Sequence, residues 1–162
     1  MVTRKAPHKE IEDDPGADVR LEMAVLAADG EDGVEASGIE VERDETSYSY
    51  RTLELLAERE PQSELFFLLG ADMAAGLASW REPARVLELA KLGVVPRPGV
   101  GLGAVSSALE RLGAADRAEI IDMPLCGASS TTVRQRVREG KPLRHLVPDP
   151  VVRVIAEREL YR

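Results

Sequence analysis

Apolar residues recur along the chain with two spacings, one typical of helices and one typical of buried strands. In residues 17–28 they return every three or four positions, so this segment should form an amphipathic helix that Gly30 ends. The same spacing predicts helices between Tyr50 and Pro61, at 71–77, 82–91 and 104–112, between Ser130 and Gly140, and at 149–160. Apolar runs or alternating positions predict strands at 34–41, 64–69, 92–95 and 119–123. The last three runs are continuous enough to be buried on both faces.

Strands that alternate with helices predict an α/β fold with a parallel sheet, because parallel strands need crossover connections. The length suits a single domain, residues 1–162. In such sheets, ligands bind beyond the carboxyl ends of the strands. Segments 70–72, 96–97 and 127–134 each follow a predicted strand, so we expect them to share one edge of the sheet.

Charge narrows the class of ligand. The chain has 21 Lys and Arg against 29 Asp and Glu, a net charge of −8, which argues against nucleic acid or an anionic membrane as a partner. Arginine nevertheless dominates from Arg134 onward, and a local positive site suits a small anionic ligand. With one cysteine, no apolar leader and no apolar run of membrane-span length, we expect a cytoplasmic protein. A homo-oligomer is compatible with these features and not required by them.

Small hydroxyl residues stand just before the helix predicted between Ser130 and Gly140. Ser129 or Ser130 can cap that helix by accepting a hydrogen bond from a first-turn N–H group. Free N–H groups, hydroxyls and Arg134 one turn into the helix make a candidate anion site. The alternative is an ordinary Ser-capped surface helix whose arginines are solvated.

Short motifs along the chain together resemble one family. They occupy residues 7–9, 20–23, 47–49, 67–72, 79–80, 94–99, 129–134, 146–149 and 160–162. The chain resembles the bacterial nicotinate-nucleotide adenylyltransferases of the nucleotidyltransferase superfamily over essentially its whole length. The resemblance implies a Rossmann-like, doubly wound parallel sheet. It also implies transfer of AMP from ATP, with Mg²⁺ bridging the phosphates, to nicotinate mononucleotide, which gives deamido-NAD and pyrophosphate in NAD biosynthesis.

Two groups of residues match the family's ATP-binding motifs. Ser129, Thr131 and Arg134 match an Ile-Ser-x-Thr-x-x-Arg signature that resembles a triphosphate cradle. In that role Arg134 would offset charge that builds on the leaving pyrophosphate. Gly70 and Asp72 match a Gly-x-Asp motif that lies against the adenosine, where a carboxylate can accept from ribose hydroxyls. The alternative for Asp72 is a cap on the helix that follows.

Other matches imply a site for nicotinate mononucleotide. Trp80 matches a tryptophan that packs on the nicotinate ring, although a single tryptophan is also a natural core residue. The family often has another aromatic residue next, where this chain has Arg81. Tyr48 and Ser49 match a Tyr-Thr pair that resembles a carboxylate-recognition site.

Two basic residues are candidates for the phosphate of the mononucleotide. Arg97 stands in a Pro-rich turn after the 92–95 strand, and its alternative is a surface arginine in a rigid turn. Lys9 is on a loop that could close over phosphates. No metal-ligating constellation is evident, so we expect the protein itself to hold no metal.

The family has a first strand, a Gly-x-Phe-Asp-Pro-x-His-x-Gly-His segment and a helix before the loop at residues 7–9, at which this chain begins. The histidines of that segment are expected to contact the ATP phosphates, and neither His8 nor His145 is placed to replace them. We therefore name no certain catalytic residue. Two alternatives follow, a related adenylyltransferase of the pantetheine-phosphate type and a nucleotide-binding module without catalysis. Trp80 and the Tyr48–Ser49 pair argue against the first.

We expect residues 1–162 alone to turn over little or no substrate, because the triphosphate would lack those histidine contacts. The measurement is pyrophosphate release with both substrates, for residues 1–162 beside a version extended upstream in the reading frame. Equal activity of the two forms would place the chemistry elsewhere in the chain.

Overall fold

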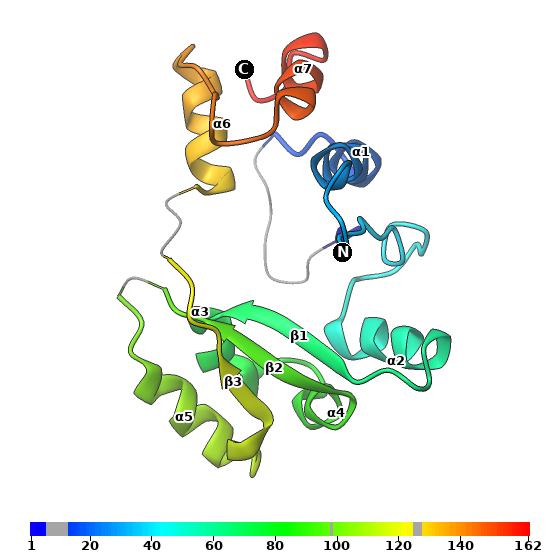
Figure 1. Ribbon diagram of the computed structural model, residues 1–162, viewed down its shortest axis with the longest axis vertical. Coiled ribbons are helices and arrows are strands. Elements are labelled where there is room, and N and C mark those ends of the chain that lie inside the picture. The colour runs from blue at the N-terminus through cyan, green and yellow to red at the C-terminus, as the bar shows by residue number, and fades with distance from the viewer. Residues whose placement is uncertain (6–12, 98, 125–127) are drawn as a thin grey trace. The chain divides into compact units, whose positions relative to one another are not determined.

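The computed structural model describes residues 1–5, 13–97, 99–124 and 128–162. Contacts divide the chain into two compact units, one of Met1–Ser47 with Gly127–Arg162 and the other of Tyr48–Cys126. Each unit has its own cluster of buried apolar side chains. The elements of both units are drawn in Figure 1. No helix in the described ranges is long and apolar enough to cross a membrane.

The unit Tyr48–Cys126 is built on a parallel sheet of three strands, β1 (Leu65–Gly70), β2 (Ala90–Val95) and β3 (Ala118–Ile120), in the order β1-β2-β3. The register pairs Leu65 with Ala90 and Gly70 with Val95. The α/β class and the parallel sheet predicted from the sequence are therefore confirmed. The pairing also brings the carboxyl ends of β1 and β2 to the same edge.

Helices cover one face of this sheet (Figure 1). Their bounds are α2 Ser49–Arg59, α3 Ala71–Ala75, the 3₁₀ helix η1 Leu77–Ser79, α4 Pro83–Leu89, α5 Leu102–Arg111 and the 3₁₀ helix η2 Ala115–Arg117. The core beneath them includes Leu77, Val86, Leu92 and Val94, all with no exposed surface. Pro83 begins α4, a position where the missing N–H of proline costs nothing.

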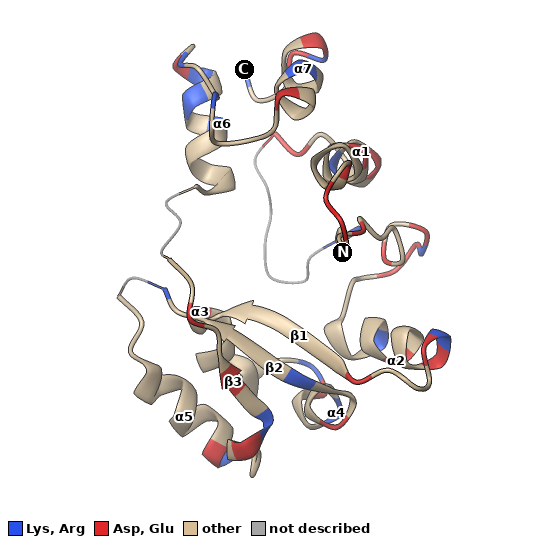
Figure 2. Cartoon of the chain, in the orientation of Figure 1, with Lys and Arg blue, Asp and Glu red and all other residues tan. Residues whose placement is uncertain are grey.

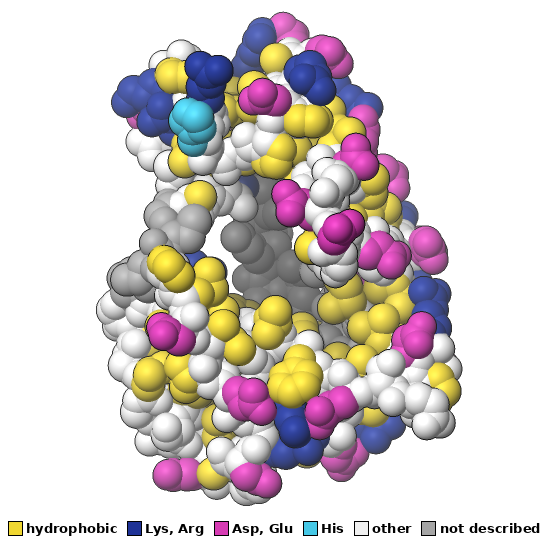
Figure 3. All heavy atoms as spheres, viewed as in Figure 1, with side chains coloured by type: hydrophobic (Ala, Val, Ile, Leu, Met, Phe, Trp, Pro, Cys, Tyr) yellow, Lys and Arg dark blue, Asp and Glu magenta, His cyan; other side chains and the backbone are white. Residues whose placement is uncertain are grey.

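On the opposite face of the sheet, the two outer strands are less buried than the sequence predicts. The runs at 64–69 and 119–123 were expected to be buried on both faces, but Phe66 and Leu68 of β1 are 45% and 64% exposed and Ile120 of β3 is 47% exposed. Each of these strands pairs on one side only within the described residues. The central strand β2 is mostly buried, as predicted. Figure 3 shows apolar side chains on the surface among charged ones.

The other unit packs α1 (Ala17–Ala28), α6 (Ser130–Arg138) and α7 (Asp149–Glu157) around a small core. Val133, Leu143, Val151 and Ile155 form that core, with Met23 of α1 packed against it. The Arg20 guanidinium donates hydrogen bonds to the carbonyls of Thr3 and Arg4 and to Asp14 Oδ1. These bonds fasten the start of the chain to α1.

The strand predicted at 34–41 is wrong. The segment forms loop and turns, with the Val41 N–H donating to the Gly38 carbonyl at 2.8 Å. A Cβ at Gly38 would lie 2.9 Å from Leu21 Cδ2, so the loop passes close to α1 because residue 38 has no side chain. Ile39 and Val41 are buried, although the segment pairs with no described strand.

Candidate functional site

Helix α6 begins with the cap predicted from its hydroxyl residues. Ser129 is the N-cap, and its Oγ accepts a hydrogen bond from the Thr132 N–H at 3.1 Å. The same Oγ lies 2.8 Å from Thr132 Oγ1. Because first-turn N–H groups lack acceptors within a helix, those of Ser130 and Thr131 remain available to an anion.

Arg134 lies one turn into α6 and is half-buried. It makes no hydrogen bond or ion pair with any residue that the structure describes. Arg138, one turn further on, pairs with Asp13 at 2.8 Å, and Arg136 donates to the Pro142 carbonyl at 2.9 Å. Figure 2 shows basic residues of α6 in its later part, where Arg136 and Arg138 stand in the last turn. Of these arginines, Arg134 is therefore the one whose guanidinium has no anionic or carbonyl partner within the described chain.

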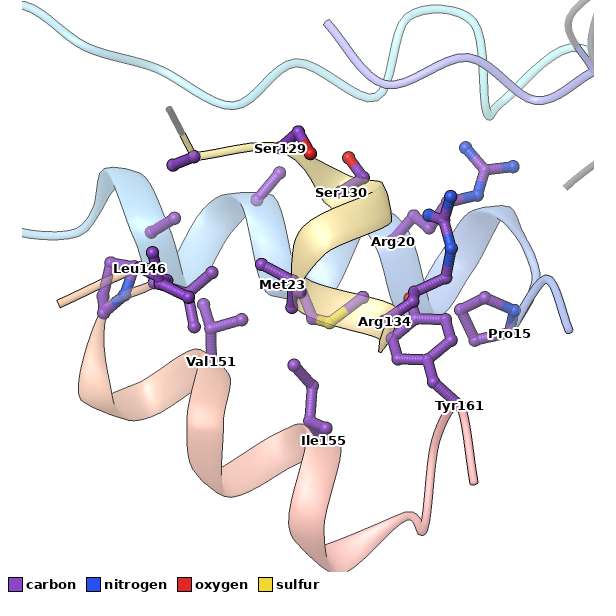
Figure 4. A pocket seen from close by; sticks show the side chains of 16 residues that line it. Pro15, Arg20, Met23, Ser129, Ser130, Arg134, Leu146, Val151, Ile155 and Tyr161 are labelled. Atoms are coloured by element: carbon purple, nitrogen blue, oxygen red, sulfur yellow. The ribbon is translucent and has the colours of Figure 1, made fainter. Parts of the chain in front are cut away.

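A pocket of about 420 Å³ lies beside the start of α6 within the same unit. Figure 4 shows Ser129, Ser130 and Arg134 at its polar end, with Met23 and Ile155 along an apolar wall. The volume is within the range of small-ligand sites. The pocket therefore combines hydroxyls and a guanidinium with apolar surface.

Two lining residues of this pocket, Arg20 and Tyr161, had no role in the sequence interpretation. Both belong to motifs quoted for the resemblance, which was the available signal. Burial raises the pKa of the Tyr161 phenol, while the positive charge of Arg134 nearby acts to lower it. Since the Arg20 guanidinium is held by Asp14 and two carbonyls, it supports the pocket wall.

At the carboxyl edge of the sheet, Gly70, Asp72 and Arg97 lie together, as their positions after β1 and β2 predicted. Arg97 Nε is 3.8 Å from Asp72 Oδ1, and both side chains are more than half exposed. A Cβ at Gly70 would lie 2.5 Å from that oxygen and 2.8 Å from Arg97 Nε. Asp72 is not the N-cap of α3, which is Gly70. The carboxylate thus faces a guanidinium that the sequence interpretation had assigned to a different substrate.

Tyr48, Ser49 and Trp80 are placed at the ends of short elements. Tyr48 is the N-cap of α2 and Ser49 is its first residue. Trp80 follows η1 and meets Phe67 edge to face, with ring centroids 6.0 Å apart. Trp80 is partly buried against the core, so one side of the indole is structural and the rest is accessible.

Lys9 and His8 lie outside the described residues, as does Gly127, the first residue of the expected edge segment 127–134. Of the three segments expected at one edge, 70–72 and 96–97 are brought together. The start of α6 belongs to the other unit. Among the described residues, no group of three or more His, Cys, Asp or Glu side chains is placed to hold a metal ion.

Comparison with known proteins identifies the family. The sequence model of the cytidylyltransferase-like family matches residues 1–136. The chain is 41% identical over 143 residues to a probable nicotinate-nucleotide adenylyltransferase of Roseiflexus sp. (strain RS-1), covering 88% of this chain and 71% of the relative. The chain belongs to the nicotinate-nucleotide adenylyltransferase family. Similar relatives of the same name occur in Roseiflexus castenholzii, 44% identical over 88% of this chain and 71% of the relative, and in Rubrobacter xylanophilus, 36% identical over 96% and 73%.

Solved structures support the fold of the family. Plasmodium falciparum nicotinic acid mononucleotide adenylyltransferase complexed with NaAD aligns with a TM-score of 0.73 at 16% identity, covering 98% of this chain and 78% of that one. The same protein complexed with APC gives a TM-score of 0.67 at 16% identity, covering 91% and 76%. At this identity the likeness concerns the fold. The Rossmann-like α/β class inferred from the sequence is confirmed.

Substitution of Gly70 tests the arrangement at the sheet edge. The backbone of Gly70 (φ −70°, ψ 153°) suits alanine, so Gly70→Ala should keep the free energy of unfolding within about 1 kcal/mol. The new Cβ should separate Arg97 from Asp72, because Asp72 Oδ1 and Arg97 Nε would both lie too close to the added carbon. Two-dimensional NMR of arginine Nε–H groups should therefore show a shifted Arg97 signal.

Gly103→Ala is the matched control, because a Cβ there meets no atom within 4 Å. Its Arg97 signal should be unchanged. An unshifted Arg97 signal in Gly70→Ala would contradict the described contact.

Proposed function

We propose that this protein transfers the adenylyl group of ATP to nicotinate mononucleotide, giving deamido-NAD and pyrophosphate in NAD biosynthesis. The proposal rests on family membership, at up to 44% identity to relatives with that name, and on one observation from the structure. That observation is the Ser-capped start of α6, where Arg134 has no partner within the described chain and faces a pocket. Such a helix start is suited to phosphate groups.

Two groups of residues are proposed for ATP, each considered within its own unit. Free N–H groups at the start of α6, with Ser129, Thr131 and Arg134, would bind the triphosphate. Gly70 allows close backbone approach to the adenosine, and Asp72 would accept from its ribose hydroxyls. A ribose hydroxyl that took Asp72 would compete with the Arg97 guanidinium now 3.8 Å away.

The nicotinate mononucleotide would be held by residues of the unit Tyr48–Cys126. The accessible part of Trp80 offers a flat surface to the nicotinate ring. Tyr48 and Ser49 at the start of α2 would lie at the carboxylate, and Arg97 would bind the phosphate. Lys9 is proposed for the same phosphate from the sequence alone.

The chemistry is an in-line displacement that needs no nucleophile from the protein. A phosphate oxygen of the mononucleotide attacks the α-phosphorus of ATP and forms the new P–O–P bond. The bond between the α-phosphorus and the bridging oxygen breaks, and pyrophosphate leaves with its electron pair. ATP enters with a divalent cation, for which we propose Mg²⁺, bridging its phosphates as part of the substrate. Arg134 offsets charge on the departing phosphates.

Arg134→Ala should raise the dissociation constant for ATP about tenfold or more, because a charged donor to phosphate is lost. Calorimetry on residues 1–162 measures this without requiring turnover. Arg138→Ala is the control, since Arg138 lies on the same helix but pairs with Asp13. Equal effects of the two substitutions, or no effect of Arg134→Ala, would remove Arg134 from the phosphate site.

Trp80 should report binding of the second substrate. It is the single tryptophan, so stacking of nicotinate should quench the fluorescence of the protein, and 4′-phosphopantetheine should not. Trp80→Ala should weaken binding of nicotinate mononucleotide and leave ATP binding unchanged. If Trp80→Ala unfolds the protein, and the unmodified chain shows no quenching, the indole is a core residue alone.

A further inference from the structure

Arg81 occupies a position that the family often gives to a second aromatic residue, directly after Trp80. Its guanidinium carbon lies 5.3 Å from the centroid of the Tyr48 ring. This distance is within the range of a cation–π contact. The contact joins two positions that are far apart in the sequence and that both belong to the proposed mononucleotide site.

The charge of Arg81 has no counterion in the part of the chain that the structure describes, because Arg81 forms no hydrogen bond or ion pair there. Three other arginines of the same unit have polar partners. Arg85 bonds Glu54 and Glu88 at 3.0 and 2.9 Å, and Arg117 donates twice to the Leu87 carbonyl. Arg51 lies 5.6 Å over the Tyr50 ring, in the same kind of contact, but also pairs with Glu54 at 3.9 Å.

The backbone on both sides of Arg81 is fixed. Trp80 is held on one side by its edge-to-face contact with Phe67. On the other side Glu82 has a left-handed backbone, with φ 53° and ψ 54°, immediately before Pro83 begins α4. This conformation is costly for a residue with a side chain, so its surroundings must impose it. Arg81 therefore starts from a constrained position and reaches Tyr48 from there.

We propose that Arg81 determines specificity by binding the carboxylate of the nicotinate ring, so that the protein prefers the acid mononucleotide over the amide. The proposal rests on the proposed function and names the group that the site selects. A cation–π contact uses none of the N–H groups of the guanidinium as a hydrogen-bond donor to an oxygen, so the N–H groups of Arg81 remain free for another acceptor. Those groups match a carboxylate, which accepts two parallel hydrogen bonds.

The amide of nicotinamide mononucleotide offers one acceptor oxygen and an NH₂ group that cannot accept from a guanidinium. It also carries no charge to compensate Arg81. The start of α2 also favours the acid over the amide. Ser49 and Tyr50 are first-turn residues, and the N–H groups of a first turn stabilise a nearby negative charge. The difference between acid and amide is thus a full charge placed beside an uncompensated arginine.

The test measures binding of nicotinate mononucleotide and nicotinamide mononucleotide to residues 1–162 by calorimetry. The unmodified chain should bind the acid more tightly. Arg81→Gln should raise the dissociation constant for the acid about tenfold, the low end for a hydrogen bond to a charged group, and leave that for the amide unchanged. Arg81→Lys should restore part of the preference, because it keeps the charge without the planar fork.

Arg51→Gln is the matched control, since it also removes an arginine in a cation–π contact with a tyrosine. It should leave the acid preference intact. The inference is overturned if Arg81→Gln weakens both mononucleotides equally, if it changes neither, or if Arg51→Gln has the same selective effect. In those outcomes the proposed function stands, because the mononucleotide still binds. Failure of both mononucleotides to bind the unmodified chain would overturn the proposed function and this inference with it.

Discussion

Parallel pairing of β1 with β2 is the constraint that positions the candidate site residues of the unit Tyr48–Cys126. The register sets Gly70 opposite Val95, and the residues that follow each strand, Asp72 and Arg97, are then within 3.8 Å of each other. A parallel pair needs a crossover, and here the crossover carries η1, Trp80 and the start of α4. The same connection that satisfies the sheet therefore also positions the aromatic residue proposed for nicotinate.

Local sequence signals predicted the helices well and the surroundings of the strands less well. Helix α1 has the predicted bounds, 17–28, and Ser129 caps α6 as one of the two expected residues. Such signals are local, because a cap or a helical spacing is satisfied within a few residues. Whether a strand is covered on both faces depends on what packs there, which a run such as 64–69 does not encode. The failed strand at 34–41 has the same cause, since Ile39 and Val41 are buried within a loop that pairs with no described strand.

The site residues were named chiefly through the resemblance, and their mutual contacts were not. The shared edge of segments 70–72 and 96–97 was predicted, but the ion pair between Asp72 and Arg97 was not, because the two residues stand on different connections and neither lies in a distinctive charge pattern. The contact between Arg81 and Tyr48 was missed for the same reason. Arg20 and Tyr161 belong to motifs of the resemblance. Their place in one pocket depends on how α1 and the chain end pack on α6. Family likeness thus identified parts, and packing decided which parts act together.

The uncovered face of the sheet has a consequence for the colloidal behaviour of the protein. Strand β1 combines two exposed apolar side chains with an edge that is unpaired within the described residues, and such edges favour pairing between molecules. Charged side chains near the strand oppose such pairing. Lys91 pairs with Glu64 at 2.8 Å and lies 5.6 Å over the Phe66 ring. The net charge of −8 adds repulsion between whole molecules. Acidification neutralises carboxylates and weakens that repulsion. We therefore expect the protein to self-associate more readily at acidic pH than at neutral pH.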